Sequence, residues 1–272
     1  MSMSTEEVIA AGQKYVMNTY GRLPIVIDKG EGCYVWDLDG NRYLDLVAGI
    51  AVNSLGHSHP AVTRAIQEQC GKLLHCSNLY WIENQVKLAK LLVEKSGLGK
   101  AFFCNSGAEA NEAAIKLARK WGNGEKYHII TMQKSFHGRT LGSLAATAQE
   151  KYQKAFRPLP EGFSAVPLGD LEALEKEIRP ETCAIMLEPI QGESGIHVPS
   201  KEYMQGVQAL CRKHNILLIL DEVQTGLGRT GKSFAFQNFD LEPDIISLAK
   251  AIANGVPMGA IVAKTEVADC FQ

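Results

Sequence analysis

A lysine at the end of an apolar stretch is the feature of this sequence that most clearly indicates chemistry. Lys250 ends the largely apolar run 245–249 and precedes the Gly-rich segment 253–259. Burial favours the neutral form of an amine, so a lysine in this position is costly unless its amine is used. A neutral amine is what Schiff-base formation with a carbonyl compound requires. The pattern therefore predicts that Lys250 binds a carbonyl cofactor.

A carboxylate follows a second apolar run. Residues 216–220 are apolar throughout, and Asp221 comes directly after them. An acid at the end of a strand can hold a pyridinium nitrogen in its protonated form. Together, Lys250 and Asp221 predict a site for pyridoxal 5'-phosphate.

The segment 105–109 lies between a predicted strand and a predicted helix. Ser106 and Glu109 have the spacing of a capping box, and a well-capped helix that binds nothing is the simplest interpretation. Gly107 and Ala108 lack bulk, so a phosphate could reach the free N–H groups and the positive end of the helix dipole. The lysine site downstream favours the phosphate interpretation.

Two further segments follow strands and carry candidate residues. Phe136 could stack on a flat heteroaromatic ring, and Arg139 could clamp a carboxylate in a bidentate manner. A core phenylalanine and a surface arginine are the alternative, which the sequence alone favours. In the segment 188–193, Glu193 could face a substrate or only cap a loop. Because the carboxyl ends of the strands of an open α/β sheet meet at one edge, these segments are expected to converge there.

His57 and His59 resemble a metal-binding pair. No third ligand follows at a suitable spacing, and the pair lies between Gly56 and Pro60. We therefore expect a hydrogen-bonded loop and no metal.

Composition excludes several classes of protein. The chain has 272 residues, of which 46% are hydrophobic and 21% charged, as in ordinary globular proteins. A net charge of −2 does not suggest nucleic acid or an anionic membrane as a partner. The first residues carry acids where a targeting peptide would carry Lys or Arg. Seven cysteines without a Cys-x-x-Cys pair predict reduced, mostly buried thiols in the cytoplasm.

Apolar periodicity predicts an α/β fold. The turn Asp39-Gly40-Asn41 predicts a hairpin over residues 34–45, within an N-terminal segment 1–55. Beyond it, apolar strands separated by helices predict a largely parallel sheet that is covered on both faces. The predicted helices cover residues 61–74, 81–95, 109–121, 138–148, 170–178 and 201–214. The predicted strands cover residues 101–104, 127–132, 183–187, 216–220, 244–249 and 258–263. A last helix is predicted from residue 264 to the end.

The order and spacing of these motifs identify a resemblance to the class III, pyridoxal-phosphate-dependent aminotransferases of fold type I. The matching stretches run along essentially the whole chain: Gly30-Glu31-Gly32-x-Tyr34-x-Trp36-Asp37, Gly56-His57-x-His59-Pro60, Ser77-Asn78-Leu79-Tyr80, Phe102-Phe103-Cys104-Asn105-Ser106-Gly107-Ala108-Glu109-Ala110, Phe136-His137-Gly138-Arg139, Asp221-Glu222-Val223-Gln224-Thr225-Gly226 and Leu248-Ala249-Lys250. Within this class the chain is most similar to the members that act on N-acetylornithine.

The resemblance implies a role for each matching residue. Lys250 would bind the cofactor and move the substrate proton, Asp221 would pair with the pyridine nitrogen, and Arg139 would bind the substrate carboxylate. Glu193 would match a glutamate that screens an arginine used by the second substrate. The implied cofactor-binding residues are Gly107 and Ala108 at the phosphate, Phe136 and Val223 on the two ring faces, Gln224 near the ring hydroxyl, and Asp221, Glu222 and Lys250.

The resemblance also implies a reaction and an assembly. The δ-amino group of N-acetylornithine would move to 2-oxoglutarate, giving N-acetylglutamate semialdehyde and glutamate, a step of arginine biosynthesis. An ornithine, succinylornithine or 4-aminobutyrate transaminase, or an inactive fragment, is the alternative. We expect a cytoplasmic homodimer, with residues 56–272 as an incomplete large domain. Residues 1–55 would belong to a small domain whose C-terminal part is absent.

Overall fold

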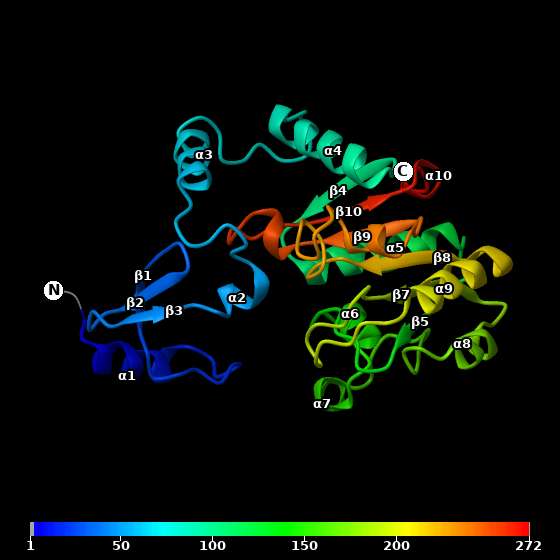
Figure 1. Cartoon of the computed structure of the whole chain (residues 1–272), viewed down its shortest axis with the longest axis horizontal. Helices are drawn as coiled ribbons and strands as arrows, with labels where there is room; N and C mark the ends of the chain where they lie inside the picture. The colour runs from blue at the N-terminus through cyan, green and yellow to red at the C-terminus, as the bar shows by residue number, and fades with distance from the viewer. Residues whose placement is uncertain (1–2, 272) are drawn as a thin grey trace. The chain divides into compact units, whose positions relative to one another are not determined.

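The computed structural model describes residues 3–271, and its contacts divide the chain into two compact units (Figure 1). The first unit comprises residues 1–79 and the second comprises residues 80–272. The boundary predicted at residue 55 separates a part of the small domain from the large domain, and it stays a prediction. Within residues 3–271, no helix is long and apolar enough to cross a membrane.

The first unit is built around a small antiparallel sheet of order β1-β2-β3. The predicted hairpin is confirmed, because β2 pairs antiparallel with β3 across the turn at Gly40, whose φ is +85°. The carboxylate of Asp37 fixes this turn by accepting hydrogen bonds from the backbone N–H of Asn41 (2.8 Å) and the hydroxyl of Tyr43 (2.7 Å). The elements are α1 (Thr5–Tyr15), β1 (Ile27–Glu31), β2 (Tyr34–Asp37), β3 (Arg42–Leu44), α2 (Ala48–Ala51) and α3 (Pro60–Cys70).

The two histidines of this unit have structural contacts. Nε2 of His57 lies 2.7 Å from a carboxylate oxygen of Asp45, and Nδ1 of His59 accepts a hydrogen bond from the backbone N–H of Ala61 at the start of α3. The hydrogen-bonded loop predicted for them is confirmed. No cluster of three or more potential metal ligands occurs among the described residues.

The second unit contains a sheet of order β4-β10-β9-β8-β7-β5-β6. Strand β10 runs antiparallel to both β4 and β9, and the pairings from β9 to β6 are parallel, so the predicted largely parallel sheet is confirmed. The strands are β4 (Lys100–Cys104), β5 (His128–Met132), β6 (Phe163–Val166), β7 (Thr182–Leu187), β8 (Leu217–Asp221), β9 (Ile245–Leu248) and β10 (Gly259–Ala263). The helices are α4 (Glu83–Ser96), α5 (Gly107–Trp121), α6 (Leu141–Ala146), α7 (Glu150–Gln153), α8 (Leu171–Glu177), α9 (Lys201–His214) and α10 (Thr265–Ala268), with short 3-10 turns at Lys154–Phe156, Ala235–Asn238 and Lys250–Ile252.

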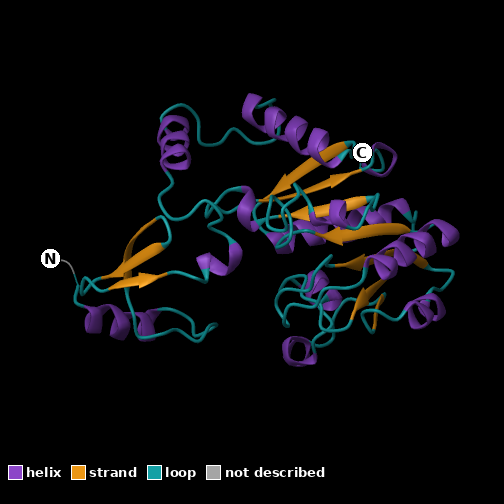
Figure 2. Ribbon diagram, in the orientation of Figure 1, coloured by secondary structure: helices purple, strands orange, loops and turns teal. Residues whose placement is uncertain are grey.

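Helices cover both faces of this sheet (Figure 2). Successive strand residues point to opposite faces, so each buried strand contributes to two separate cores. In β8, Leu218 and Leu220 join the core formed with α4, α8 and α9, whereas Leu217 and Ile219 join the core formed with α5 and α10. The complete burial of β5, β7, β8, β9 and β10 explains why their sequences are apolar without alternation.

Several details differ from the sequence-based predictions. The helix predicted over residues 138–148 is the shorter α6, because Gly138 has a φ of +136° and Thr147 is extended. The last predicted helix is the short α10, which ends at Ala268, and Gln272 lies outside the described residues. The cysteines, all of which lie within residues 3–271, are free, but the prediction that most are buried is wrong. Cys183 and Cys211 are buried, whereas Cys33 and Cys70 are exposed.

Candidate active site

The candidate residues of the second unit converge at one edge of its sheet. Strands β4, β5, β7, β8 and β9 run in the same direction, and the antiparallel β10 begins where they end, since Gly259 pairs with Cys104. The segments that follow these strands therefore meet, as the sequence predicted. A Cβ atom placed on Gly107 would lie 2.9 Å from Val223 and 3.4 Å from Ala249, so the segments after β4, β8 and β9 are in direct contact.

Asp221 is the buried anion of this edge. Its Oδ2 accepts hydrogen bonds from Nδ1 of His137 (2.7 Å) and from the side-chain amide of Asn111 (2.8 Å), and its Oδ1 accepts one from the backbone N–H of Val223 (3.0 Å). Burial raises the pKa of Asp221, but the hydrogen bond and charge of His137, with the other donors, outweigh burial and lower it. Asp221 is therefore ionised.

Two buried polar atoms, on the side chains that donate to Asp221, have no hydrogen-bond partner within the described structure. They are Oδ1 of Asn111 and Nε2 of His137. Buried polar atoms are usually paired, and an unpaired one carries a desolvation cost. Each such atom needs an explanation, and a bound ligand beside Asp221 would supply one.

Lys250 follows β9 at the same edge. The side chain is half-buried, and the residue begins a 3-10 turn with a φ of +51°, an uncommon conformation for a residue that is not glycine. Burial lowers the pKa of the Lys250 amine, although the charges of Asp221 and Glu188 oppose this effect. Burial thus shifts the Lys250 amine in the direction of its neutral form.

The N-terminus of α5 has part of the predicted capping box. The Ser106 hydroxyl accepts a hydrogen bond from the backbone N–H of Glu109 (3.2 Å), as expected. The Glu109 carboxylate, however, accepts from the N–H of Asn105 rather than from that of Ser106. Neither side chain occupies the N–H groups of Gly107 and Ala108, which begin the helix and remain suitable donors to an anion.

Phe136 and Arg139 follow β5, and both contact Tyr152, a residue that the sequence analysis did not single out. The ring of Tyr152 in α7 packs edge-to-face on Phe136, with centroids 5.8 Å apart, and the guanidinium carbon of Arg139 lies 4.1 Å from the Tyr152 centroid. The Tyr152 hydroxyl donates a hydrogen bond to Glu193, in the segment after β7. The structure therefore brings three predicted residues together around Tyr152.

Glu188 is a second buried acid that the sequence did not single out. Its carboxylate accepts hydrogen bonds from the backbone N–H of Phe136 (3.1 Å) and of Gly192 (3.4 Å), so it connects the segments after β5 and β7. Burial is the main reason why the pKa of Glu188 rises to about 7, the charge of His137 lowers it, and the charge of Asp221 adds to the rise. The position of Glu188 directly after an apolar strand, like that of Asp221, was the available signal.

Glu222 and Gln224 follow Asp221 and have different surroundings. Both oxygens of Glu222 accept hydrogen bonds, from the Thr225 hydroxyl (2.6 Å) and the backbone N–H groups of Ala235 (2.9 Å) and Phe236 (2.7 Å). These contacts hold the loop after β8 and leave no free oxygen for a ligand. Gln224 is half-buried and lies against Gly192, where a Cβ atom would meet its side-chain oxygen at 1.5 Å.

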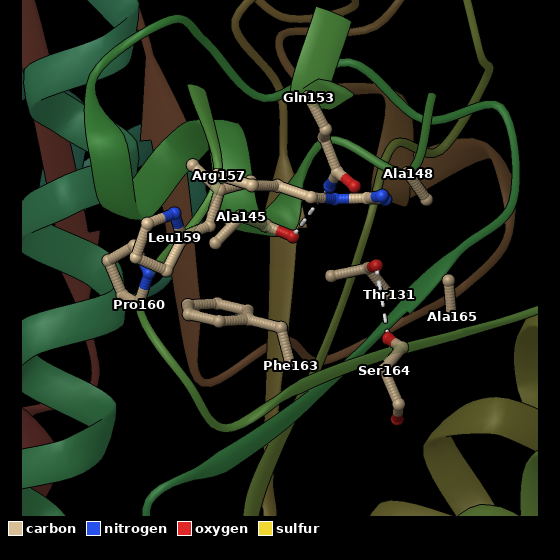
Figure 3. Close-up of a pocket in the computed structure, with 11 residues that line it drawn as sticks. Thr131, Ala145, Ala148, Gln153, Arg157, Leu159, Pro160, Phe163, Ser164 and Ala165 are labelled. Carbon is tan, nitrogen blue, oxygen red and sulfur yellow. Dashed lines mark hydrogen bonds between the residues drawn. The ribbon is translucent and has the colours of Figure 1, made fainter. Parts of the chain in front are cut away.

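A separate hollow of about 600 Å³ lies over β5 and β6 (Figure 3). Figure 3 shows Gln153 beside Ala145, and Thr131 bonded to Ser164, on its walls. Small and apolar side chains form most of the lining, and no candidate residue of the sheet edge takes part: Thr131, Ala145, Ala148, Gln153, Arg157, Pro158, Leu159, Pro160, Phe163, Ser164 and Ala165.

The mostly parallel sheet between helices is the aminotransferase fold, since a solved ornithine aminotransferase matches it with a TM-score of 0.94. The family model for class III aminotransferases matches residues 15–272. The chain belongs to this family of aminotransferases.

Known relatives are similar over nearly the whole chain. The acetylornithine aminotransferase of Caldanaerobacter subterraneus subsp. tengcongensis is 57% identical over 265 residues, covering 96% of this chain and 67% of that protein. The acetylornithine aminotransferase of Methanocaldococcus jannaschii is 55% identical, covering 99% of this chain and 69% of that protein. A structure of the ornithine aminotransferase of Toxoplasma gondii, with partial occupancy of PLP at its active site, has a TM-score of 0.94 at 34% identity and covers 99% of this chain and 65% of that one. The chain thus spans about two thirds of the length of these relatives.

Proposed function

We propose that this chain carries the active-site edge of a pyridoxal-phosphate-dependent aminotransferase. The proposed reaction moves the δ-amino group of N-acetylornithine to 2-oxoglutarate, giving N-acetylglutamate semialdehyde and glutamate. The observation that carries this proposal is Lys250, an amine whose pKa is lowered by burial, at the same sheet edge as the ionised Asp221. The choice of amino donor is supported by 57% and 55% identity to two acetylornithine aminotransferases.

The residues at the sheet edge fit pyridoxal 5'-phosphate. The carboxylate of Asp221, kept ionised by His137, is a suitable acceptor for a protonated ring nitrogen. The N–H groups of Gly107 and Ala108 at the start of α5 suit its phosphate. The absence of a Cβ atom on Gly107 keeps this helix end close to Val223. The solved Toxoplasma relative has PLP at its active site.

The proposed roles of this chain's residues follow from these positions. When bound, pyridoxal phosphate supplies an electron sink that acidifies the C–H bond beside the transferred amino group. Nζ of Lys250, whose pKa is lowered by burial, would accept the proton from that carbon and release it again within the same half of the reaction, and the second half would reverse this transfer. Phe136 and Val223 would hold the ring between them, as the family resemblance implies. Arg139 orients the substrate by binding its carboxylate.

For Glu222 we propose a role other than the cofactor binding that the family resemblance implied. Because Thr225, Ala235 and Phe236 occupy both of its oxygens, we propose that it positions the loop that carries Val223 and Gln224. Burial raises the pKa of Glu222, and the three donors partly offset this rise.

A panel of amino donors tests the reaction. We expect glutamate formation from 2-oxoglutarate to be fastest with N-acetylornithine, and Arg139→Lys to raise the KM for the donor by about tenfold or more, because a point charge cannot reproduce a bidentate clamp. Faster turnover of ornithine would favour the second candidate, an ornithine aminotransferase, which the Toxoplasma likeness supports. Faster turnover of succinylornithine or 4-aminobutyrate would assign the chain to those transaminases.

We further propose that the protein acts as a homodimer in the cytoplasm, as the family resemblance implies. Sedimentation of the purified protein with and without pyridoxal phosphate tests the dimer. A monomer at all concentrations would contradict it.

A further inference from the structure

Tyr152 contacts an aromatic, a positively charged and a negatively charged side chain, more than an ordinary surface tyrosine does. It belongs to α7, is half-buried, and contacts Phe136, Arg139 and Glu193 at the same time. The guanidinium carbon of Arg139 lies 4.1 Å from the centroid of the Tyr152 ring, and the Tyr152 hydroxyl donates a hydrogen bond to Oε1 of Glu193. A cation–π contact on one side and a hydrogen bond to an anion on the other make Tyr152 the connection between a positive and a negative group.

Two glutamines hold Tyr152 in place. Nε2 of Gln153 lies 2.8 Å from the carbonyl oxygen of Thr147 and within 3.3 Å of those of Leu144 and Ala145, which fixes α7 to the end of α6. Figure 3 shows the contact of Gln153 with Ala145. Gln149 donates to the carbonyl oxygen of Ser135 (3.0 Å) and to Oε2 of Glu193 (2.8 Å). Each oxygen of Glu193 therefore has its own donor. The hydrogen bonds from the side chains of Gln153 and Gln149 to backbone carbonyl oxygens set the position of Tyr152.

The charges on either side of Tyr152 do not neutralise each other directly. Burial raises the pKa of Glu193, but the hydrogen bonds from Tyr152 and Gln149 and the charges of Lys151 and Arg139 outweigh burial and lower it, so Glu193 is ionised. Within the described residues, Arg139 and Glu193 form no ion pair with each other, and Lys151 is 3.7 Å from Glu193. Arg139 instead lies over two aromatic rings, those of Tyr152 and Phe136.

We propose that Tyr152 is a positioning residue that keeps Arg139 available for a substrate carboxylate by holding it apart from Glu193. The inference rests on the proposed role of Arg139 in substrate binding. Without the ring, the long Arg139 side chain loses its support and pairs with the nearby ionised Glu193. A substrate carboxylate must then compete with that internal anion for the guanidinium. Tyr152 acts on carboxylate affinity and leaves the proton transfer at Lys250 unchanged.

The test uses the protein loaded with pyridoxal phosphate and glutarate, a dicarboxylate that lacks a reactive carbonyl and amine. Calorimetric titration gives the glutarate affinity without catalysis, and the cofactor affinity is measured in parallel. We expect Tyr152→Leu to weaken glutarate binding by about fivefold, the size expected for an exposed cation–π contact plus a competing ion pair. Tyr152→Phe keeps the ring under Arg139 and should stay within about twofold of the wild type.

A double variant separates competition from simple loss of packing. Tyr152→Leu combined with Glu193→Gln removes the competing anion, so glutarate affinity should recover most of the loss. Phe156 is an exposed aromatic residue in the adjacent 3-10 turn. Phe156→Leu is therefore the matched control and should leave the glutarate affinity unchanged. For turnover, Tyr152→Leu should raise the KM for the amino donor and leave kcat near the wild-type value.

Each failure of the test has its own meaning. Arg139→Leu should abolish glutarate binding, and if it does while Tyr152→Leu binds like the wild type, the role of Tyr152 is overturned and that of Arg139 stands. If Arg139→Leu has no effect, the proposed carboxylate site and the role of Tyr152 are both overturned. If Glu193→Gln fails to restore binding to Tyr152→Leu, or if Tyr152→Phe is as weak as Tyr152→Leu, separation of the two charges by the ring is refuted.

Discussion

Nδ1 of His137 lies 2.7 Å from Oδ2 of Asp221, and both side chains are buried. Burial lowers the pKa of His137, but the hydrogen bond and charge of Asp221 outweigh burial and raise it, while the pKa of Asp221 is lowered. The contact therefore shifts both groups toward their charged forms and favours the ionised carboxylate of Asp221. The side-chain amide of Asn111 donates to the same carboxylate oxygen at 2.8 Å. This arrangement keeps a negative charge at the end of β8, where the proposed cofactor ring would need it.

The charge of Asp221 is expected to matter more for the reaction than for cofactor binding. Asp221→Asn removes the anion that would keep the ring nitrogen protonated, so single-turnover rates should fall by about 100-fold or more, the size seen when one preorganised charge partner is removed. Cofactor affinity, from equilibrium titration, should fall much less. The control for a purely structural loss is Asp244→Asn. Asp244 lies at the opposite edge of the sheet, where its carboxylate accepts a hydrogen bond from the backbone N–H of Leu218 (2.7 Å). Equal losses of rate and affinity would mean that Asp221 is structural.

Lys250 is expected to be the residue that forms a covalent bond with the cofactor. Burial lowers the pKa of its amine, which makes it more nucleophilic at neutral pH than an exposed lysine. Lys250→Ala should abolish the visible absorbance band of the bound cofactor and its capture by borohydride, as followed by peptide mass spectrometry. Lys134→Ala, at an exposed position shortly after β5, should leave both unchanged. Borohydride labelling of Lys134 or Lys264 in the wild type would show that the site is assigned wrongly.

Glu188 is expected to make stability fall as the pH rises. Its pKa is about 7 in the folded protein and near 4.5 when unperturbed, so the folded state binds more protons than the unfolded state between these values. The stabilisation is complete below about pH 4.5 and is lost as the pH rises through 7, by on the order of 3 kcal/mol, most of it between pH 5 and 8. The side chain introduced by Glu188→Gln cannot ionise. The free energy of unfolding of this variant should therefore rise relative to that of the wild type by most of this amount between pH 5 and 8.

Urea unfolding at several pH values measures this difference. Glu175→Gln is the control, because the hydrogen bond and charge of Lys213 lower the pKa of Glu175 and its ionisation is complete below this pH range. Parallel pH profiles for the wild type and Glu188→Gln would rule out the raised pKa of Glu188.

Gly107 is expected to tolerate no methyl group. A Cβ atom there would meet Val223 at 2.9 Å, so Gly107→Ala must displace the loop after β8 and should cost about 1–3 kcal/mol of stability. Cofactor affinity should fall with it, because the displaced loop carries Val223. Gly12→Ala is the matched substitution: Gly12 lies inside α1, and no atom lies within 4 Å of the position that a Cβ atom would take, so alanine should stabilise by about 0.5–1 kcal/mol. If Gly107→Ala bound the cofactor like the wild type, the start of α5 would not be its phosphate site.

Several features were predictable from the sequence because they depend on local pattern. Apolar runs that end in Asp221 and Lys250 indicated buried strands, and the structure has both residues at the same sheet edge. The residue types of Gly107 and Ser106 indicated a helix start, and α5 begins there. Strand β6, by contrast, was not predicted, because it lies at the edge of the sheet and is only partly buried, which leaves no strong apolar run in its sequence.

Only the tertiary structure decided which side chains meet. His137 and Asp221 are 84 residues apart, and Tyr152 and Glu193 are 41 residues apart, so no local pattern could have paired them. Sequence neighbours, conversely, were separated: Glu222 follows Asp221 directly but contacts the loop at residues 235–236 instead. The physical reason is that successive residues at a strand end point to opposite faces of the sheet. A motif therefore identifies an edge of the sheet, and the packing of the segments beyond it determines which of its residues face the site.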